Sequence, residues 1–234
     1  MSKKNRHKLK KNGQNKEFNW SNLLMFLSIG GLVLFLVWIV VKPNSANIDT
    51  SAWVKGNSDS KIVVAEYSDF QCPACKRYAP IFEQVIDKYQ NQVRFEFHHF
   101  PLISIHSNAI AGAKAAEAAG KQGKFWQMHD YLYAHQSDWE NRGNLDAVFA
   151  DYAKTLGLDV EKFKTDYKDK NILRKINKQR SKALAMGLRG TPTIRINNKT
   201  IKTPTSVAEF SKILDNLLGL DKTASDSAKN LQDK

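Results

Sequence analysis

The two cysteines of the 234-residue chain, Cys72 and Cys75, are separated only by Pro73 and Ala74. An apolar segment, residues 62–65, precedes the pair, and an amphipathic segment follows it. This order predicts a turn from a strand into a helix at the cysteines. Two thiols at such a turn indicate redox chemistry or a metal site. The chain must therefore fold so that one strand ends where a helix begins, with both thiols at that junction.

The segments on either side of the cysteines predict a β-α-β unit. Residues 61–67 form a near-continuous apolar run, which is typical of a strand covered on both faces. Residues 76–90 carry apolar side chains at helical spacing, and Pro80 is expected to kink this helix. Residues 93–100 alternate in polarity and predict the next strand. The crossover between the two strands is expected to be right-handed.

A long helical region follows this unit. Helices are expected over residues 107–120, 125–133, 145–156, 160–167 and 171–186. The sequence thus predicts an α/β domain over residues 56–220, with a helical insertion at 104–187.

The chain returns to strands near its end. Residues 193–196 and 200–202 predict a hairpin that turns at Asn197 and Asn198. Residues 206–218 then predict a last helix. Its N-cap is expected to be Ser206, with Glu209 three residues later at the spacing of a capping box.

The N-terminal part of the chain predicts a membrane anchor. Residues 23–41 contain no charged side chain, and as a helix they nearly match a hydrocarbon core of about 30 Å. The preceding tail, residues 1–22, carries seven Lys or Arg and one acid, so it is expected to stay in the cytoplasm. The domain is then expected outside the cytoplasm, after a linker at residues 42–55.

A cleaved signal peptide is the alternative to an anchor. Its apolar region would be shorter, about 7 to 15 residues, and would end at small residues. Residues 42–46 (Lys-Pro-Asn-Ser-Ala) are a poor cleavage site, which favours the uncleaved anchor. The polar residues 221–234 are expected to be disordered.

The net charge of +13 is explained in part by this basic tail. The remaining excess lies along expected helix faces such as residues 162–182, which are interpreted as solvated surface. Binding to nucleic acid is therefore not expected.

The position of the two thiols predicts different roles for them. Cys72 is expected at the helix N-terminus, with Pro73 in the first turn, where a missing N–H costs nothing. The partial positive charge there stabilises a thiolate, so Cys72 is expected to be an exposed nucleophile of low pKa. Cys75, one turn further, is expected to be covered and to resolve a mixed disulfide.

The two cysteines could serve two other uses. A zinc site needs four ligands, and the chain has no second cysteine pair; His98, His99 or His106 would have to complete it. A purely structural bridge across two residues would restrict the unfolded chain very little. No metal and no other cofactor is expected.

Two further features bear on the thiols. An X-Pro bond is where a cis peptide is least costly, and a cis bond at Thr191-Pro192 would turn the Thr191 backbone outward, beside the thiols. Glu66 lies in the otherwise apolar strand; if buried, it would have a raised pKa and could accept the proton of the inner thiol. Strand alternation leaves open that Glu66 faces solvent instead.

Taken together, these motifs resemble the thioredoxin superfamily, and within it the DsbA-like extracytoplasmic thiol-disulfide oxidoreductases. The matching features are the strand with Glu66, the motif from Ser68 to Cys75, Pro80, residues 95–102, the helical insertion and Gly190-Thr191-Pro192-Thr193. They extend from about Trp53 to Leu220.

The resemblance implies a thioredoxin-like fold with an inserted helical subdomain, preceded here by one transmembrane helix. It implies that Cys72 attacks or carries the disulfide, that Cys75 resolves it, and that Thr191, before a cis Pro192, pairs with the bound polypeptide. The chain has Ala74 where strongly oxidising members have His, so we expect a less oxidising couple.

The function expected from this resemblance is an anchored oxidase that gives its disulfide to secreted or membrane polypeptides and is reoxidised by a DsbB-like or VKOR-like membrane partner. A reductase or isomerase fed by a membrane electron donor would use the same residues. A non-catalytic thioredoxin-fold binding module is the third reading.

Overall fold

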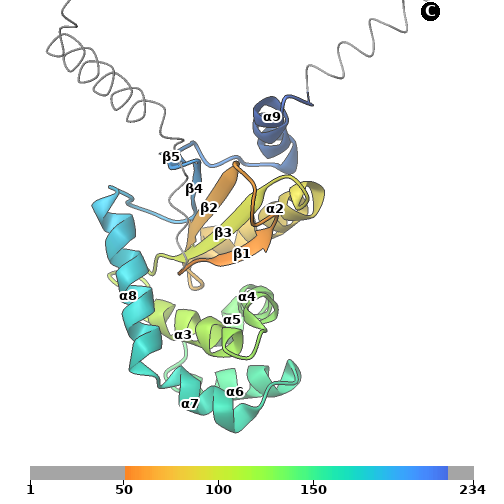
Figure 1. Cartoon of the computed structure of the whole chain (residues 1–234). Coiled ribbons are helices and arrows are strands. Elements are labelled where there is room, and N and C mark those ends of the chain that lie inside the picture. The colour runs from red at the N-terminus through yellow and green to blue at the C-terminus, as the bar shows by residue number, and fades with distance from the viewer. Residues whose placement is uncertain (1–50, 221–234) are drawn as a thin grey trace, which may run out of the picture. The chain divides into compact units, whose positions relative to one another are not determined.

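The computed structural model describes residues 51–220, which form a mixed α/β fold around one five-stranded sheet (Figure 1). The strands lie in the order β1-β3-β2-β4-β5. Their bounds are β1 (Trp53–Gly56), β2 (Val63–Ser68), β3 (Arg94–His99), β4 (Thr193–Ile196) and β5 (Lys199–Thr200). β2 and β3 are parallel, and the other neighbouring pairs are antiparallel.

The predictions for the basic tail, the transmembrane anchor and the C-terminal tail lie outside the described residues. Across residues 51–220, no helix has both the length and the apolar character needed to cross a membrane.

The predicted β-α-β unit is confirmed as β2, helix α2 (Pro73–Tyr89) and β3. All six residues of β2 are buried, because helices cover both faces of the sheet. On one face, Val64 packs in a cluster with Tyr78 and Phe82 of α2. On the other face, Ala65 and Tyr67 pack with residues that follow β3 and with the end of the helical region.

Helix α2 begins at Pro73, as the predicted position of Cys72 requires, and thus three residues before the periodic segment at 76–90. Cys72 is the N-cap and Pro73 the first helical residue, where its missing N–H leaves no bond unmade. The helix continues through Pro80 and buries one stripe of side chains: Cys75, Tyr78, Phe82, Val85, Ile86 and Tyr89. This stripe holds α2 against the sheet and thereby fixes the position of both cysteines.

Six helices lie between β3 and β4. They are α3 (Ala109–Gly120), α4 (Phe125–Ala134), α5 (Gln136–Trp139), α6 (Leu145–Thr155), α7 (Val160–Tyr167) and α8 (Lys170–Ala185). They share a core with the start of α2, and α8 runs from this helical layer back toward β4 (Figure 1). The short α5 was not predicted; the fully buried Trp139 fixes it by packing on Phe149 and donating from Nε1 to Leu132 O at 3.0 Å.

Strand β1 corrects the sequence interpretation, because Trp53–Lys55 had been assigned to the linker. Tertiary contacts that the local sequence does not reveal hold this strand. Trp53 stacks on Phe125 at 4.4 Å and donates from Nε1 to Glu117 Oε1 at 2.7 Å. At the end of the strand, Gly56 has φ of 79° and lies so close to Val93 O that a Cβ would be 2.4 Å from it. Only glycine fits there without a shift.

The C-terminal elements differ from the predictions in detail. The hairpin turns at Asn197 and Asn198, both with positive φ as its tight turn requires, but β5 is shorter than predicted. Helix α9 (Val207–Leu218) begins after Ser206, whose Oγ accepts the Glu209 N–H. The Glu209 carboxylate accepts from Thr205 N rather than from the N-cap itself, so the capping box is only half confirmed.

Candidate redox-active site

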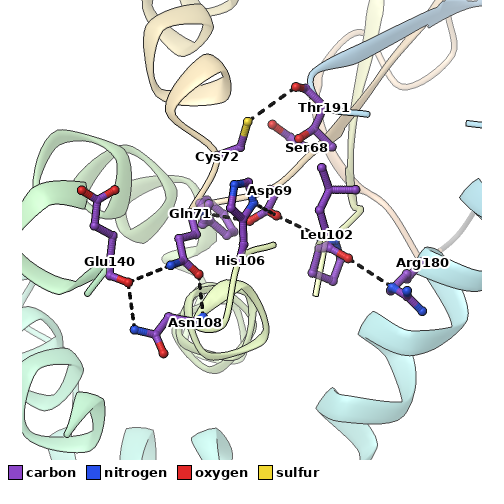
Figure 2. Close-up of polar contacts among 12 residues, drawn as sticks. Ser68, Asp69, Gln71, Cys72, Leu102, His106, Asn108, Glu140, Arg180 and Thr191 are labelled. Atoms are coloured by element: carbon purple, nitrogen blue, oxygen red, sulfur yellow. Dashed lines mark hydrogen bonds and ion pairs between the residues drawn. The ribbon is translucent and has the colours of Figure 1, made fainter. Parts of the chain in front are cut away.

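The two cysteines lie where β2 leads into α2, and both are free thiols. Cys75 is completely buried, as predicted. Cys72 is only 7 % exposed, which corrects the expectation of an exposed nucleophile. Its burial has a visible cause, because the segment at Thr191 lies against it (Figure 2).

The Thr191-Pro192 bond is cis, and it brings residues far apart in the sequence together. In its protonated form the Cys72 thiol donates to Thr191 O at a sulfur–oxygen distance of 3.5 Å (Figure 2). The main chain just before the proline therefore lies beside the thiol, as the sequence predicted. Ala74 contributes its backbone N–H to the thiol rather than a side-chain charge.

The two thiols have opposite pKa shifts. A hydrogen bond from Cys75 is the largest cause that lowers the pKa of Cys72 to about 5, and burial opposes it. Thr191 and the N–H groups of Ala74 and Cys75 lower it further. Burial raises the pKa of Cys75 well above its usual range, and the neighbouring Cys72 raises it more. At neutral pH, Cys72 is thus a thiolate and Cys75 a thiol, which is the division of roles that disulfide exchange needs.

Glu66 faces the interior, so the solvent-facing alternative is wrong. Its residue is 1 % exposed, and burial raises the pKa of its carboxyl to about 7, against a hydrogen bond from Ser68 that lowers it. Tyr78, on the face of α2 that meets this part of the sheet, has a buried hydroxyl without a hydrogen-bond partner among residues 51–220. Glu66 is thus a buried acid that titrates near neutral pH.

Asp69 is a structural residue of the site that sequence reasoning missed. Its Oδ1 accepts from Gln71 N at 2.8 Å, and its Oδ2 accepts from Leu102 N at 2.8 Å. The same Oδ2 lies 2.7 Å from His106 Nδ1 (Figure 2). An Asp that bonds the N–H two residues later is a known turn signal, so the first contact could have been predicted. The contacts with the loop after β3 depend on the tertiary fold.

The helical insertion also holds the backbone of the motif. Gln136 of α5 donates to Phe70 O at 2.7 Å and to Cys72 O at 3.1 Å. Gln71 donates to Glu140 O and accepts from Asn108 N at the start of α3 (Figure 2). These amides join segments more than 35 residues apart, and no local pattern predicts them.

The histidines considered as metal ligands have other partners. His98 Nε2 lies 3.0 Å from Glu96, His99 Nε2 lies 2.9 Å from Glu117, and His106 bonds Asp69. Within the described part of the chain, no three His, Cys, Asp or Glu side chains gather as a metal site would require.

The comparisons with known proteins agree with this geometry. The family model described as Thioredoxin matches residues 49–216. BdbD from Bacillus subtilis has a similar structure, with 25 % identity, a TM-score of 0.62, and coverage of 71 % of this chain and 92 % of that one. The thiol-disulfide exchange protein alpha-DsbA2 from Wolbachia pipientis has 22 % identity and a TM-score of 0.63, over 74 % and 90 % of the two chains. The structural neighbours are thus DsbA-like proteins.

A different name comes from a longer relative. A protein named Na(+)/H(+) antiporter NhaA 1 from Mycolicibacterium vanbaalenii is 34 % identical over 166 residues, which are 69 % of this chain and 26 % of that protein. The chain spans about a quarter of the length of such relatives. Their name therefore describes proteins of which the matched part is a minor portion.

Proposed function

Because the chain belongs to the thioredoxin family, we propose that it is a thiol-disulfide oxidoreductase that exchanges a Cys72–Cys75 disulfide with cysteine-containing polypeptides. One observation carries this proposal: a Cys72 thiol of low pKa lies 3.5 Å from the carbonyl before a cis proline, with a protonated Cys75 one turn behind it.

The exchange would take place in two steps. A substrate thiolate attacks Cys72 Sγ of the disulfide, the Cys72–Cys75 bond breaks, and Cys75 takes up a proton as it leaves. A second substrate thiolate then attacks the substrate sulfur of the mixed disulfide, and Cys72 leaves as a stable thiolate. The backbone of Thr191 offers the substrate strand a place to pair next to the reacting sulfur.

The proposed direction is oxidation of the substrate. A low pKa of Cys72 stabilises the reduced protein, which makes the oxidised protein a better donor of its disulfide. Since Ala74 supplies no imidazolium, we propose a couple less oxidising than that of the members with His at this position.

Two exposed apolar side chains on the loop after β3 support a polypeptide substrate. Ile103 and Ile105 are 48 % and 71 % exposed on the loop that Asp69 holds against the motif. Such side chains would cover apolar residues of an unfolded or extended substrate.

The proposed location is the outer side of the membrane, with residues 23–41 as an anchor and a membrane protein as the redox partner. The uncharged length of this segment and the basic residues before it support this proposal. In intact cells, a membrane-impermeant thiol reagent should label the Cys75→Ala variant at Cys72. Labelling only after lysis would place the domain in the cytoplasm.

The catalytic proposal is tested by trapping. Cys75→Ala should accumulate mixed disulfides with cellular polypeptides through Cys72, and these should disappear on reduction. Cys72→Ala, with Cys75 intact, is the matched control and should accumulate none. Adducts that form equally through Cys75 would contradict the assigned roles.

Direction is tested by the redox state of the pair in living cells. Rapid acid quenching followed by alkylation should find mostly disulfide if the protein is an oxidase. A pool of mostly dithiol would instead favour the reductase or isomerase.

A further inference from the structure

Ser68 and Tyr133 form a buried hydroxyl pair next to Cys75 to which the exchange mechanism gives no part. Ser68 is the last residue of β2, two positions after Glu66, so both side chains lie on the same face of the strand. That face is the one covered by α2, because Val64, two positions earlier still, packs against Tyr78 and Phe82. Glu66, Ser68 and the inner cysteine therefore meet between β2 and α2.

The contacts of Ser68 connect these groups. Its Oγ lies 2.9 Å from the hydroxyl of Tyr133, which reaches in from α4. Hydrogen bonding with the Ser68 side chain lowers the pKa of both the Glu66 carboxyl and the Cys75 thiol, which places the Ser68 hydroxyl near both groups. All four residues are at most 3 % exposed, so bulk water has little access to the inner thiol.

We propose that the Ser68 hydroxyl transfers the proton between Cys75 and Glu66, and that Tyr133 holds this hydroxyl in the orientation that the transfer needs. This inference rests on the proposed function, since Cys75 must gain or lose a proton in every exchange. In this proposal Ser68 exchanges a proton with the reacting thiol and is a catalytic residue, whereas Tyr133 is a positioning residue.

The step can be followed for a mixed disulfide between Cys72 and glutathione. The Cys75 S–H proton moves to Ser68 Oγ while the Ser68 O–H proton moves to the Glu66 carboxylate. The Cys75 thiolate attacks Cys72 Sγ, a Cys72–Cys75 bond forms, and glutathione leaves as a thiolate. Glu66 ends protonated, and no external oxidant or reductant is needed. Loss of the Cys72–Cys75 disulfide to a thiolate runs through the same atoms in reverse.

The surrounding groups keep this proton within the three side chains. The charge of Glu66 acts on Tyr78 of α2, and the charges of Glu66 and Cys75 act on Tyr133 of α4. Burial raises the pKa of both tyrosines well above the usual range, so they stay neutral near pH 7. Asp69, next along the chain, acts on Tyr133 through its charge. Within residues 51–220, Glu66 has no ion pair with a cation.

The alternative is that Ser68 only satisfies a buried hydroxyl of Tyr133. A structural role of this kind would lower stability when Ser68 is removed, but it would not change how one chemical step depends on pH. The two readings thus differ in kinetics rather than in folding.

The experiment separates the step at Cys72 from the step at Cys75. The reduced full chain is mixed with oxidised glutathione, quenched in acid at millisecond times, and its mixed disulfide and internal disulfide are quantified by mass spectrometry from pH 5 to pH 9. Formation of the mixed disulfide uses Cys72 alone and serves as the internal control.

Ser68→Ala should form the mixed disulfide at the wild-type rate but resolve it at least about ten-fold more slowly near pH 7, within the range of general acid–base effects. Ser68→Thr should restore most of the rate. Glu66→Gln should slow resolution similarly, and Ser68→Ala combined with Glu66→Gln should be no slower than either alone, because both changes break one path. Tyr133→Phe should slow resolution a few-fold.

Resolution at the wild-type rate and pH profile in Ser68→Ala would overturn the inference and leave the proposed function standing. A wild-type chain that forms no mixed disulfide would overturn both. Should Ser68→Ala fail to fold, Tyr133→Phe decides, since an unchanged rate in that variant contradicts the proposed orientation of Ser68.

Discussion

Two buried glutamates, Glu66 and Glu117, have pKa shifts of opposite direction. Both are at most 4 % exposed. Burial alone raises the pKa of each, but for Glu117 hydrogen bonds and charge from His99 and Lys175 overcome it and lower the pKa. For Glu66, burial outweighs a hydrogen bond from Ser68, and its pKa is raised to about 7. Two carboxyls buried to a similar degree thus have pKa shifts of opposite direction, because their partners differ.

The partners of Glu117 come from three elements. Trp53 of β1 donates at 2.7 Å, His99 of β3 lies at 2.9 Å, and Lys175 of α8 donates at 2.8 Å. This carboxylate on α3 therefore joins the edge of the sheet to the helical insertion.

The largest effect is expected for Glu117→Gln, which removes the charge and leaves buried donors poorly paired. We expect a loss of about 3 to 5 kcal/mol in the free energy of unfolding, the usual cost of breaking a buried pair. Denaturant unfolding at pH 7 measures it. A loss below about 1 kcal/mol would mean that this cluster is no stronger than a surface pair.

Glu66→Gln should instead increase the free energy of unfolding at neutral and higher pH. The folded-state pKa lies above the ordinary value of 4.5, so the folded protein holds the proton more tightly, and stability is lost as pH rises from about 4.5 to about 7. At pH 8 the variant should be more stable than the wild type by about 3 kcal/mol, at about 1.4 kcal/mol per pH unit. The gain should vanish at pH 4, and a gain that is equal at both pH values would contradict the raised pKa.

Lys175→Met should make Glu117 more like Glu66. It removes one charged hydrogen bond from a partly exposed lysine, and we expect a loss of about 2 kcal/mol. The pKa of Glu117 should rise, so the loss should shrink as pH falls toward 4, where the carboxyl of the variant becomes protonated. Lys178→Met, at an exposed position of the same helix, is the control and should change stability little.

The smallest effect is expected for Ala74→His. This change places a cation beside the thiols, as Lys175 is placed beside the Glu117 carboxylate. The imidazolium should lower the pKa of Cys72 further and stabilise the reduced form by about 1 kcal/mol, which corresponds to a potential about 20 mV more oxidising. Equilibration with glutathione measures the potential, with Ala74→Gln as a neutral control. A more reducing variant would contradict the role assigned to Ala74.

Features with a local physical cause could be predicted from the sequence. The burial of β2, the N-cap at Cys72 and the cis bond before Pro192 all depend on neighbouring residues. The position of the Thr191 backbone beside the thiols follows from a cis bond before Pro192 and from the family resemblance. The burial of Cys72, by contrast, depends on how closely the Thr191 segment approaches the thiol, which no local pattern predicts.

Features made by long-range pairing could not be predicted. Strand β1 is held in place because Trp53 stacks on Phe125 and donates a hydrogen bond to Glu117, both more than 60 positions away. The Ser68–Tyr133 pair likewise spans 65 positions, and serine at the end of a strand carries no signal of its own. The sequence shows Glu66 and Glu117 only as two glutamates. The direction of each pKa shift depends on tertiary partners that the sequence does not reveal.

The hold of Asp69 on the loop after β3 has a practical consequence for redesign. Asp69 bonds the loop through the main-chain N–H of Leu102 and through the His106 side chain. Between these two contacts, Ile103 and Ile105 are exposed to solvent. Ile103 and Ile105 can therefore be substituted without loss of the Asp69 contacts that hold the loop. Side chains at residues 103–105 can thus be varied in a library while the Asp69 contacts keep the loop in place.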